Sequence, residues 1–250
     1  MRTGYLITAR MKSTRLKHKL TLEINDRQII RWMIDRIKLA ESIDEIIICT
    51  STNKQDNVLE EIAFEENIKI FRGHEDDVIQ RLYDASVVFD LDYALNITAD
   101  CPLVSVEYIE NTIAKYQETG ADLIRSLDLP HGFFSYGLKI AAMKKVCEIK
   151  NKSETEVWGE YFTETGLFEV IDLKIPKDII RNDFRLTLDY PEDFEFFQAI
   201  YNHFGLNTYR TTMHEIIQFL DINPRIVNIN KDLKHSYKKR WDSQNQIKLK

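Results

Sequence analysis

The chain of 250 residues is poor in glycine and cysteine, and each shortage excludes a class of site. Only eight residues are glycine, and none lies between positions 5 and 72. The N-terminal segment therefore contains neither a Walker A loop nor a dinucleotide fingerprint, because both motifs need glycines where the backbone approaches phosphate. The three cysteines, Cys49, Cys101 and Cys147, lie far apart, and their spacing matches neither a zinc site nor a disulfide framework.

Long apolar runs and an excess of positive charge are also missing. No apolar stretch approaches the roughly 20 residues that cross a bilayer, and the N-terminus lacks the pattern of a signal peptide. We therefore expect a cytoplasmic protein with no membrane partner. The net charge of −6 argues against a nucleic-acid partner, because binding to a phosphate backbone needs a broad basic face.

Against this acidic background, the segment from Arg10 to Lys19 is strongly basic. Five of its ten residues are Arg or Lys, and none is acidic. It follows a short apolar run, Tyr5 to Ile7, which predicts a strand. A cationic loop after a strand favours phosphate binding, since arginine makes bidentate contacts and lysine supplies a point charge. The candidate phosphate ligands are Arg10, Ser13, Thr14, Arg15 and Lys19.

Strand-like and helix-like segments alternate over the first half of the chain, which predicts a mostly parallel sheet sandwiched by helices. We expect one domain at 1–233 with a small inserted flap at about 126–170, followed by a basic, solvated C-terminal tail at 234–250. The expected strands include 46–50, 68–71, 93–98, 121–125, 168–173, 184–188 and 225–229. The expected flap consists of a hairpin or lid at 126–140 and helices at 141–149 and 155–165.

Two aspartates follow expected strands in the same pattern of apolar strand, aspartate and proline. They are Asp100, ahead of Pro102, and Asp189, ahead of Pro191. Ligands of open α/β sheets bind beyond the carboxyl ends of the strands, so we expect both carboxylates to face one crevice with the cationic loop. Such a pair can share one Mg²⁺ that also binds nucleotide phosphates. For Asp100, a turn or helix-cap role is the alternative.

Four segments, in order, resemble the cytidylyltransferase family, which includes the CMP-Kdo and CMP-sialic acid synthetases, and above all its SpsF-like branch for spore-coat polysaccharide. The segments are 7–16 (ITARMKSTRL), 73–78 (GHEDDV), 97–103 (ITADCPL) and 185–193 (RLTLDYPED). The resemblance implies a nucleotide-diphospho-sugar transferase (Rossmann-like) fold, CTP as co-substrate, Mg²⁺ and a homodimer. The implied reaction attaches CMP to an acidic sugar or a small phosphorylated acceptor for surface glycan biosynthesis, with release of pyrophosphate.

The resemblance also implies roles for individual residues. It implies that Asp100 and Asp189 hold Mg²⁺. It also implies that the catalytic residues are Asp100, Asp189, Arg10 and Lys19. The residues implied to bind the nucleotide are Thr8, Ala9, Arg10, Ser13, Arg15, Lys19, Asp76 and Thr98. The residues expected to contact the acceptor are His131, Tyr136, Lys139, Glu160 and Tyr161. Thr98 and Ala99 stand where the acid-sugar synthetases carry glutamine and glycine, so the acceptor's identity stays open.

Two other functions stay open from the sequence. A metal-dependent glycosyltransferase of the related fold would use an Asp-x-Asp motif, and the chain contains Asp90-Leu91-Asp92. That motif precedes the expected strand at 93–98 and so belongs to the edge of the sheet away from the expected ligand. The second alternative is a non-catalytic relative that only binds nucleotide. The presence of both aspartates and Arg10 argues against it.

Overall fold

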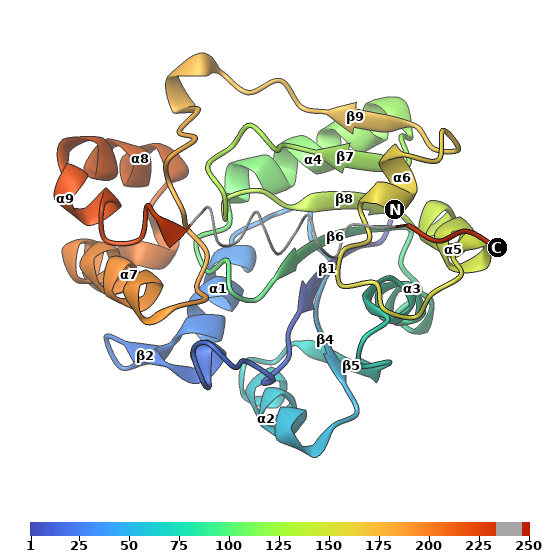
Figure 1. The fold of residues 1–250 in the computed structure, drawn as a ribbon, viewed down its shortest axis with the longest axis horizontal. Coiled ribbons are helices and arrows are strands. Elements are labelled where there is room, and N and C mark those ends of the chain that lie inside the picture. The colour runs from blue at the N-terminus through green and yellow to red at the C-terminus, as the bar shows by residue number, and fades with distance from the viewer. Residues whose placement is uncertain (234–246) are drawn as a thin grey trace.

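The computed structural model describes residues 1–233 and 247–250. The strands of the main sheet are β1 (Thr3–Thr8), β4 (Glu45–Ser51), β5 (Lys69–Gly73), β6 (Tyr93–Thr98), β7 (Leu123–Arg125), β8 (Tyr136–Lys139) and β9 (Val170–Asp172). They lie in the order β5-β4-β1-β6-β8-β7-β9 (Figure 1). Neighbouring strands are parallel except at β8, which is antiparallel to both β6 and β7. The expected mostly parallel α/β sheet is confirmed.

Shorter elements and helices surround this sheet. A separate hairpin pairs β2 (Glu23–Ile24) with β3 (Arg27–Gln28). The α-helices are α1 (Ile29–Ile37), α2 (Asn57–Glu65), α3 (Val78–Val88), α4 (Val106–Thr119), α5 (Ile140–Ile149), α6 (Glu160–Thr163), α7 (Pro191–Phe204), α8 (Met213–Ile222) and α9 (Pro224–Val227). The 3₁₀ helices are η1 (Lys19–Thr21), η2 (Lys54–Asp56), η3 (Lys177–Ile179) and η4 (Gly205–Arg210). Over residues 1–233 and 247–250, no helix combines the length and apolarity needed to cross a membrane.

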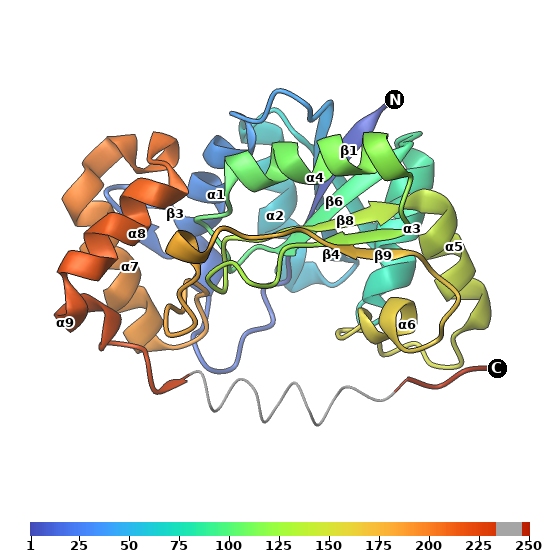
Figure 2. The same ribbon diagram turned by 90° about the horizontal axis from the view of Figure 1, so that it is seen from above.

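Helices pack on both faces of the sheet because its central strands are apolar on both sides. In β1, Tyr5 and Ile7 belong to the core that includes α1, α2, α4, α7 and α8, whereas Leu6 belongs to the core that includes α3, α5 and α6. This alternation follows the two-residue period of a strand. Figures 1 and 2 show α7, α8 and α9 gathered beside α1, and α3, α5 and α6 together at the other end of the molecule.

Two of the expected strands in the second half are wrong. Residues 225–229 do not form a strand, because Pro224 begins the short helix α9 there, and proline suits the first turn of a helix. Residues 184–188 form no strand of the sheet, and Arg185 makes only an isolated parallel bridge to His131. Backbone hydrogen bonds to Asp100 and His131 hold this segment in place instead.

The region at 126–170 contributes to the main body as well as to a flap. Residues 126–140 are more than the expected hairpin or lid, because they include β8, which lies inside the sheet between β6 and β7. The expected helix at 155–165 is reduced to α6. Residues 155–159 belong instead to the loop between α5 and α6.

The last four residues lie against this flap. Leu249 forms an antiparallel bridge with Lys150, and the N–H of Asn151 donates to the carbonyl of Lys248 at 2.7 Å. The Tyr161 hydroxyl donates to the same carbonyl at 3.2 Å. Residues 248–250 are exposed although their backbone is bonded to the flap, and the rest of the expected tail, 234–246, lies outside the described residues.

Candidate active site

The site lies where the strand order changes direction. β4 and β5 follow on one side of β1, and β6 lies on the other. Thr8 at the end of β1 pairs with Thr98 at the end of β6, and the N–H of Ala99 donates to the carbonyl of Thr8 at 2.9 Å. Ligands of open α/β sheets bind at such a switch point, beyond the carboxyl ends of the strands.

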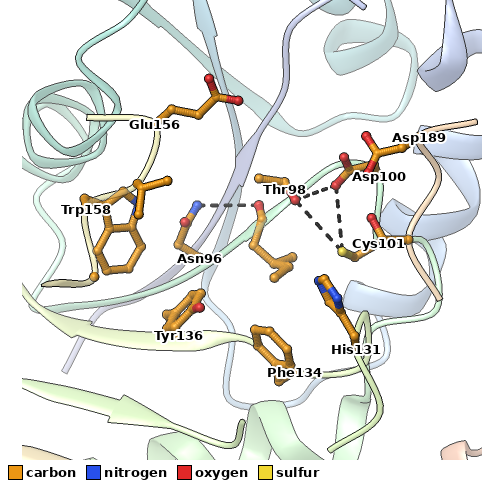
Figure 3. A pocket seen from close by; sticks show the side chains of 14 residues that line it. Asn96, Thr98, Asp100, Cys101, His131, Phe134, Tyr136, Glu156, Trp158 and Asp189 are labelled. Carbon is orange, nitrogen blue, oxygen red and sulfur yellow. Dashed lines mark hydrogen bonds between the residues drawn. The ribbon is translucent and has the colours of Figure 1, made fainter. Parts of the chain in front are cut away.

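Two adjoining cavities open there. The first, here called the basic cavity, is lined by Thr8, Arg10, Lys12, Ser13, Thr14, Arg15, Lys19, Leu20, Val78, Asn96, Thr98, Ala99, Asp100, Glu156, Trp158 and Asp189. The second, the aromatic cavity, is lined by Asn96, Ile97, Thr98, Asp100, Cys101, His131, Phe134, Tyr136, Glu156, Val157, Trp158, Gly159, Thr187 and Asp189 (Figure 3). The shared residues make the two cavities neighbours.

The basic loop, residues 10–19, is fixed by the segment before α3 and by Asp56 in η2. Arg10 donates through Nη1 to the carbonyl of Glu75 at 2.9 Å and to Oδ1 of Asp76 at 3.1 Å. Lys12 Nζ donates to Oε1 of Glu75 at 2.9 Å. The N–H of Met11 donates to Asp56 at 2.7 Å. Side chains and backbone of distant segments thus orient the loop, whose sequence has no glycine.

Asp100 and Asp189 meet at one ammonium group. Lys19 Nζ donates to Oδ2 of Asp100 at 2.6 Å and to Oδ1 of Asp189 at 3.0 Å. Arg15 also donates to Oδ1 of Asp189, at 2.6 Å. Burial alone would lower the pKa of Lys19, but the two carboxylates outweigh it and raise that pKa above its usual value. The structure thus places both aspartates beside the basic loop, although 89 positions separate them (189 − 100).

A buried network holds Asp189 from behind. Arg185 donates through Nη2 to Oδ2 of Asp189 at 3.0 Å and through Nε to Oδ1 of Asp193 at 2.9 Å. Asp193 in turn accepts the backbone N–H groups of Asp189, at 2.8 Å, and of Tyr190, at 3.0 Å. Burial acts to raise the pKa of Asp189, but Lys19, Arg15 and Arg185 hold it well below its usual range. Asp189 is therefore a fixed, ionised carboxylate at neutral pH.

Backbone hydrogen bonds bring the Asp189 segment to Asp100. The N–H of Leu188 donates to the carbonyl of Asp100 at 2.8 Å, and the N–H of Leu186 donates to the carbonyl of His131 at 2.8 Å. These bonds explain how Asp189 reaches the site although the residues before it are not a strand of the sheet.

Aromatic rings form one side of the second cavity. The Tyr136 ring packs edge-on against Phe134, with centroids 5.5 Å apart, and against Trp158, at 5.1 Å. His131 stacks on Phe134 at 5.8 Å. Burial raises the pKa of the Tyr136 hydroxyl, so that it stays protonated at neutral pH. Figure 3 shows Tyr136, Phe134 and His131 along the lower side of the cavity, Trp158 at the left, and Asp100 and Asp189 at the upper right.

Most of the residues expected at the nucleotide end line the basic cavity. They are Thr8, Arg10, Ser13, Arg15, Lys19, Thr98, Asp100 and Asp189. Ala9 is buried and does not line it, and Asp76 touches it only through Arg10.

The expected acceptor residues divide differently. His131 and Tyr136 line the aromatic cavity. Lys139 lies at the opposite edge of the sheet, because it pairs with Tyr93 at the start of β6. Glu160 and Tyr161 are buried in α6 and line neither cavity. Glu156 and Trp158 line both cavities, although the sequence analysis did not predict them as site residues.

The carboxylates suit a divalent cation that takes few protein ligands. Within the described ranges, no group of three or more His, Cys, Asp or Glu side chains could hold a metal ion by itself. Asp100 and Asp189, however, already share one cationic group, Lys19. Mg²⁺ commonly uses one or two carboxylates and completes its shell with water and phosphate oxygens, so the donor set fits it.

The Asp-x-Asp motif lies away from both cavities. Asp90 and Asp92 precede β6, at the end of the strand opposite Thr98. Asp92 accepts the backbone N–H of Arg2 at 2.6 Å, which ties it to the start of β1. A glycosyltransferase that relied on this motif would need it at the other edge of the sheet.

A mostly parallel α/β fold with a cationic loop at its switch point is of the kind that binds phosphate-bearing ligands. The family described as "Cytidylyltransferase" matches residues 5–245, and the chain belongs to this family. The resemblance found in the sequence is confirmed, and the enzyme is a nucleotidyltransferase.

Individual relatives are similar to this chain over most of its length. An uncharacterized protein of Methanocaldococcus jannaschii is 33% identical over 231 residues, which cover 92% of this chain and 94% of the relative. The spore coat polysaccharide biosynthesis protein SpsF of Bacillus subtilis is 24% identical over 88% of this chain and 94% of its own length. The structure of a cytidylyltransferase from Leptospira borgpetersenii superposes with a TM-score of 0.82 at 26% identity, covering 91% of this chain and 97% of that one.

Proposed function

We propose that this enzyme transfers CMP from CTP to a small acceptor, a sugar acid or a phosphorylated small molecule, and releases pyrophosphate. The observation that carries the proposal is the meeting of Asp100 and Asp189 at Lys19, beside the basic loop. The family supports CTP as the nucleotide. The likeness to a protein of spore coat polysaccharide biosynthesis supports a role in surface glycan synthesis. We further propose that the enzyme is a cytoplasmic homodimer.

The basic cavity provides the charge that this reaction needs. The triphosphate would lie against Arg10, Arg15 and Lys19, whose side chains line that cavity. Asp100 and Asp189 would hold Mg²⁺ beside it. Bound there, Mg²⁺ would withdraw charge from the phosphate oxygens and lower the proton affinity of an acceptor hydroxyl.

The chemical step itself requires little covalent work from the protein. An oxygen of the acceptor attacks the α-phosphorus in line, and a new P–O bond forms as the bond to pyrophosphate breaks. The cations of the basic loop neutralise the negative charge that builds on pyrophosphate. Positioning and charge stabilisation are the main sources of catalysis in such transfers.

The aromatic cavity supplies the place for the acceptor. It shares Asp100 and Asp189 with the basic cavity, so an acceptor bound in it lies beside the proposed metal ligands. The rings of Phe134, Tyr136 and Trp158 offer apolar surfaces to the carbon-rich face of a small polar molecule.

Pyrophosphate release from CTP tests the proposal directly. The assay contains Mg²⁺ and a panel of acceptors: 3-deoxy-manno-octulosonate, N-acetylneuraminate and glycerol 3-phosphate. We expect Asp100→Asn and Asp189→Asn each to lower kcat at least 100-fold, and the matched control Asp92→Asn to keep it. Near wild-type turnover in both site variants would refute the metal assignment. Release of a nucleoside diphosphate from a sugar nucleotide would instead indicate a glycosyltransferase.

A further inference from the structure

The loop between α5 and α6 brings one carboxylate to both cavities. Glu156 lines the basic cavity and the aromatic cavity, and 58% of its side chain is exposed. In Figure 3, Glu156 and Trp158 extend from the same segment, across the cavity from Asp100 and Asp189. Glu156 therefore stands between the proposed nucleotide and acceptor sites.

The backbone next to Glu156 is held firmly. The N–H of Thr155 donates to the carbonyl of Asp76 at 3.0 Å, and its hydroxyl donates to Oδ1 of Asp77 at 2.8 Å. The same hydroxyl accepts the N–H of Ile79 at 3.1 Å. These bonds anchor the loop to the start of α3. The exposed carboxylate of Glu156 can therefore turn while its backbone stays in place.

Arg10 holds this carboxylate only loosely. Its Nη2 lies 3.8 Å from Oε2 of Glu156, beyond hydrogen-bond distance, while its Nη1 bonds to the Glu75 carbonyl and to Asp76. An ion pair at this separation, with the Glu156 side chain mostly exposed, is weak. A phosphate group that reaches Arg10 would compete with Glu156 for the guanidinium and would also repel its carboxylate.

We propose that Glu156 is a specificity-determining residue that nucleotide binding releases toward the acceptor. When the triphosphate engages Arg10, the Glu156 carboxylate turns to the aromatic cavity and accepts a hydrogen bond from an O–H or N–H group of the acceptor. This inference rests on the proposed function. It implies that the nucleotide binds first and that the acceptor carries a donor on the side facing the α5–α6 loop.

The test compares Glu156→Ala with Glu154→Ala, an exposed residue of the same loop. Calorimetry with CTP and Mg²⁺ should show unchanged or up to roughly fivefold tighter binding by Glu156→Ala, the fold-change equivalent to an exposed ion pair of up to about 1 kcal/mol. The KM of the most active panel acceptor should rise at least tenfold with little change in kcat. Glu156→Gln should recover part of that KM, because its amide oxygen still accepts a hydrogen bond. Glu154→Ala should match the wild type.

Carboxyl labelling tests the release step without an acceptor. With a water-soluble carbodiimide and glycinamide, labelling of Glu156 should increase when CTP and Mg²⁺ are added, whereas labelling of Glu154 should not. Unchanged labelling of Glu156, or an unchanged acceptor KM in Glu156→Ala, would overturn the inference. Weaker CTP binding by Glu156→Ala would also overturn it. Failure of the proposed function looks different: the wild type would release no pyrophosphate with any panel acceptor.

Discussion

Replacing Lys19 by methionine should destabilise the enzyme and, at the same time, make it respond to Mg²⁺. The Lys19 ammonium bonds to both Asp100 and Asp189, and only 13% of its side chain is exposed. Lys19→Met keeps the length of the side chain but leaves two carboxylates facing each other without the cation between them. Lys17→Met is the matched control, because Lys17 is an exposed residue of the same loop.

The expected loss of stability follows from the partners that remain. Removing one member of a buried ion pair costs about 3–5 kcal/mol. Here Asp100 is 17% exposed, and Asp189 keeps Arg15 and Arg185 as partners. We therefore expect a loss of about 2–3 kcal/mol in the free energy of unfolding. For a chain of this size, that corresponds to a fall of roughly 4–12 °C in Tm.

Thermal unfolding at neutral pH, with chelator or with millimolar Mg²⁺, measures both effects. In chelator, the Tm of Lys19→Met should lie below that of the wild type. The Tm of Lys17→Met should equal that of the wild type. Mg²⁺ should then raise the Tm of Lys19→Met more than that of the wild type, because the ion replaces the missing ammonium and binding to the native state stabilises it. A Tm of Lys19→Met within 2 °C of the wild type (roughly 1 kcal/mol or less), or equal responses to Mg²⁺, would refute the reasoning.

Three further predictions concern acid stability, a tight turn and an excluded residue. The pKa of Asp189 is lowered in the fold, so the stability that it contributes is present above its unfolded value of about 3.9 and is lost as the pH falls; the Tm of Asp189→Asn should therefore decline less between about pH 5 and pH 2. Gly132 has φ +109°, and a Cβ there would lie 2.0 Å from the carbonyl oxygen of Leu186. Gly132→Ala should therefore lower the free energy of unfolding, measured by denaturant unfolding, by about 3 kcal/mol. The control Gly159→Ala should not lower it, because a Cβ at Gly159 would have no heavy atom within 4 Å. Lys139→Met should leave the acceptor KM unchanged. A tenfold rise in that KM would show that Lys139 contacts the acceptor after all.

Local sequence patterns predicted which side chains lie together at the basic cavity. An apolar segment followed by aspartate and proline is a short-range pattern, and it identified Asp100 and Asp189 as neighbours of the basic loop, although the segment before Asp189 is not a strand of the sheet. The same kind of pattern failed at 225–229, where an apolar run looked like a strand but Pro224 begins a helix.

The acceptor end could not be predicted because it depends on contacts between distant segments. Glu156 and Trp158 enter the cavities because Thr155 is bonded to the residues before α3, and no local pattern encodes that contact. Lys139 was placed wrongly because its position depends on the register of β8 against β6. One local signal for the buried network was overlooked: a charged residue, Arg185, within an apolar segment.

The hydrogen bond from the N–H of Leu188 to the carbonyl of Asp100 joins the two backbone segments that carry the paired carboxylates. Their separation is set by that short link and not by the length of the intervening polypeptide. Changes of length in the α5–α6 loop, which lies far along the chain from this hydrogen bond, can therefore reshape the acceptor side while the paired aspartates keep their spacing. Such an arrangement lets the choice of acceptor diverge during evolution without rebuilding the part of the enzyme that handles the nucleotide.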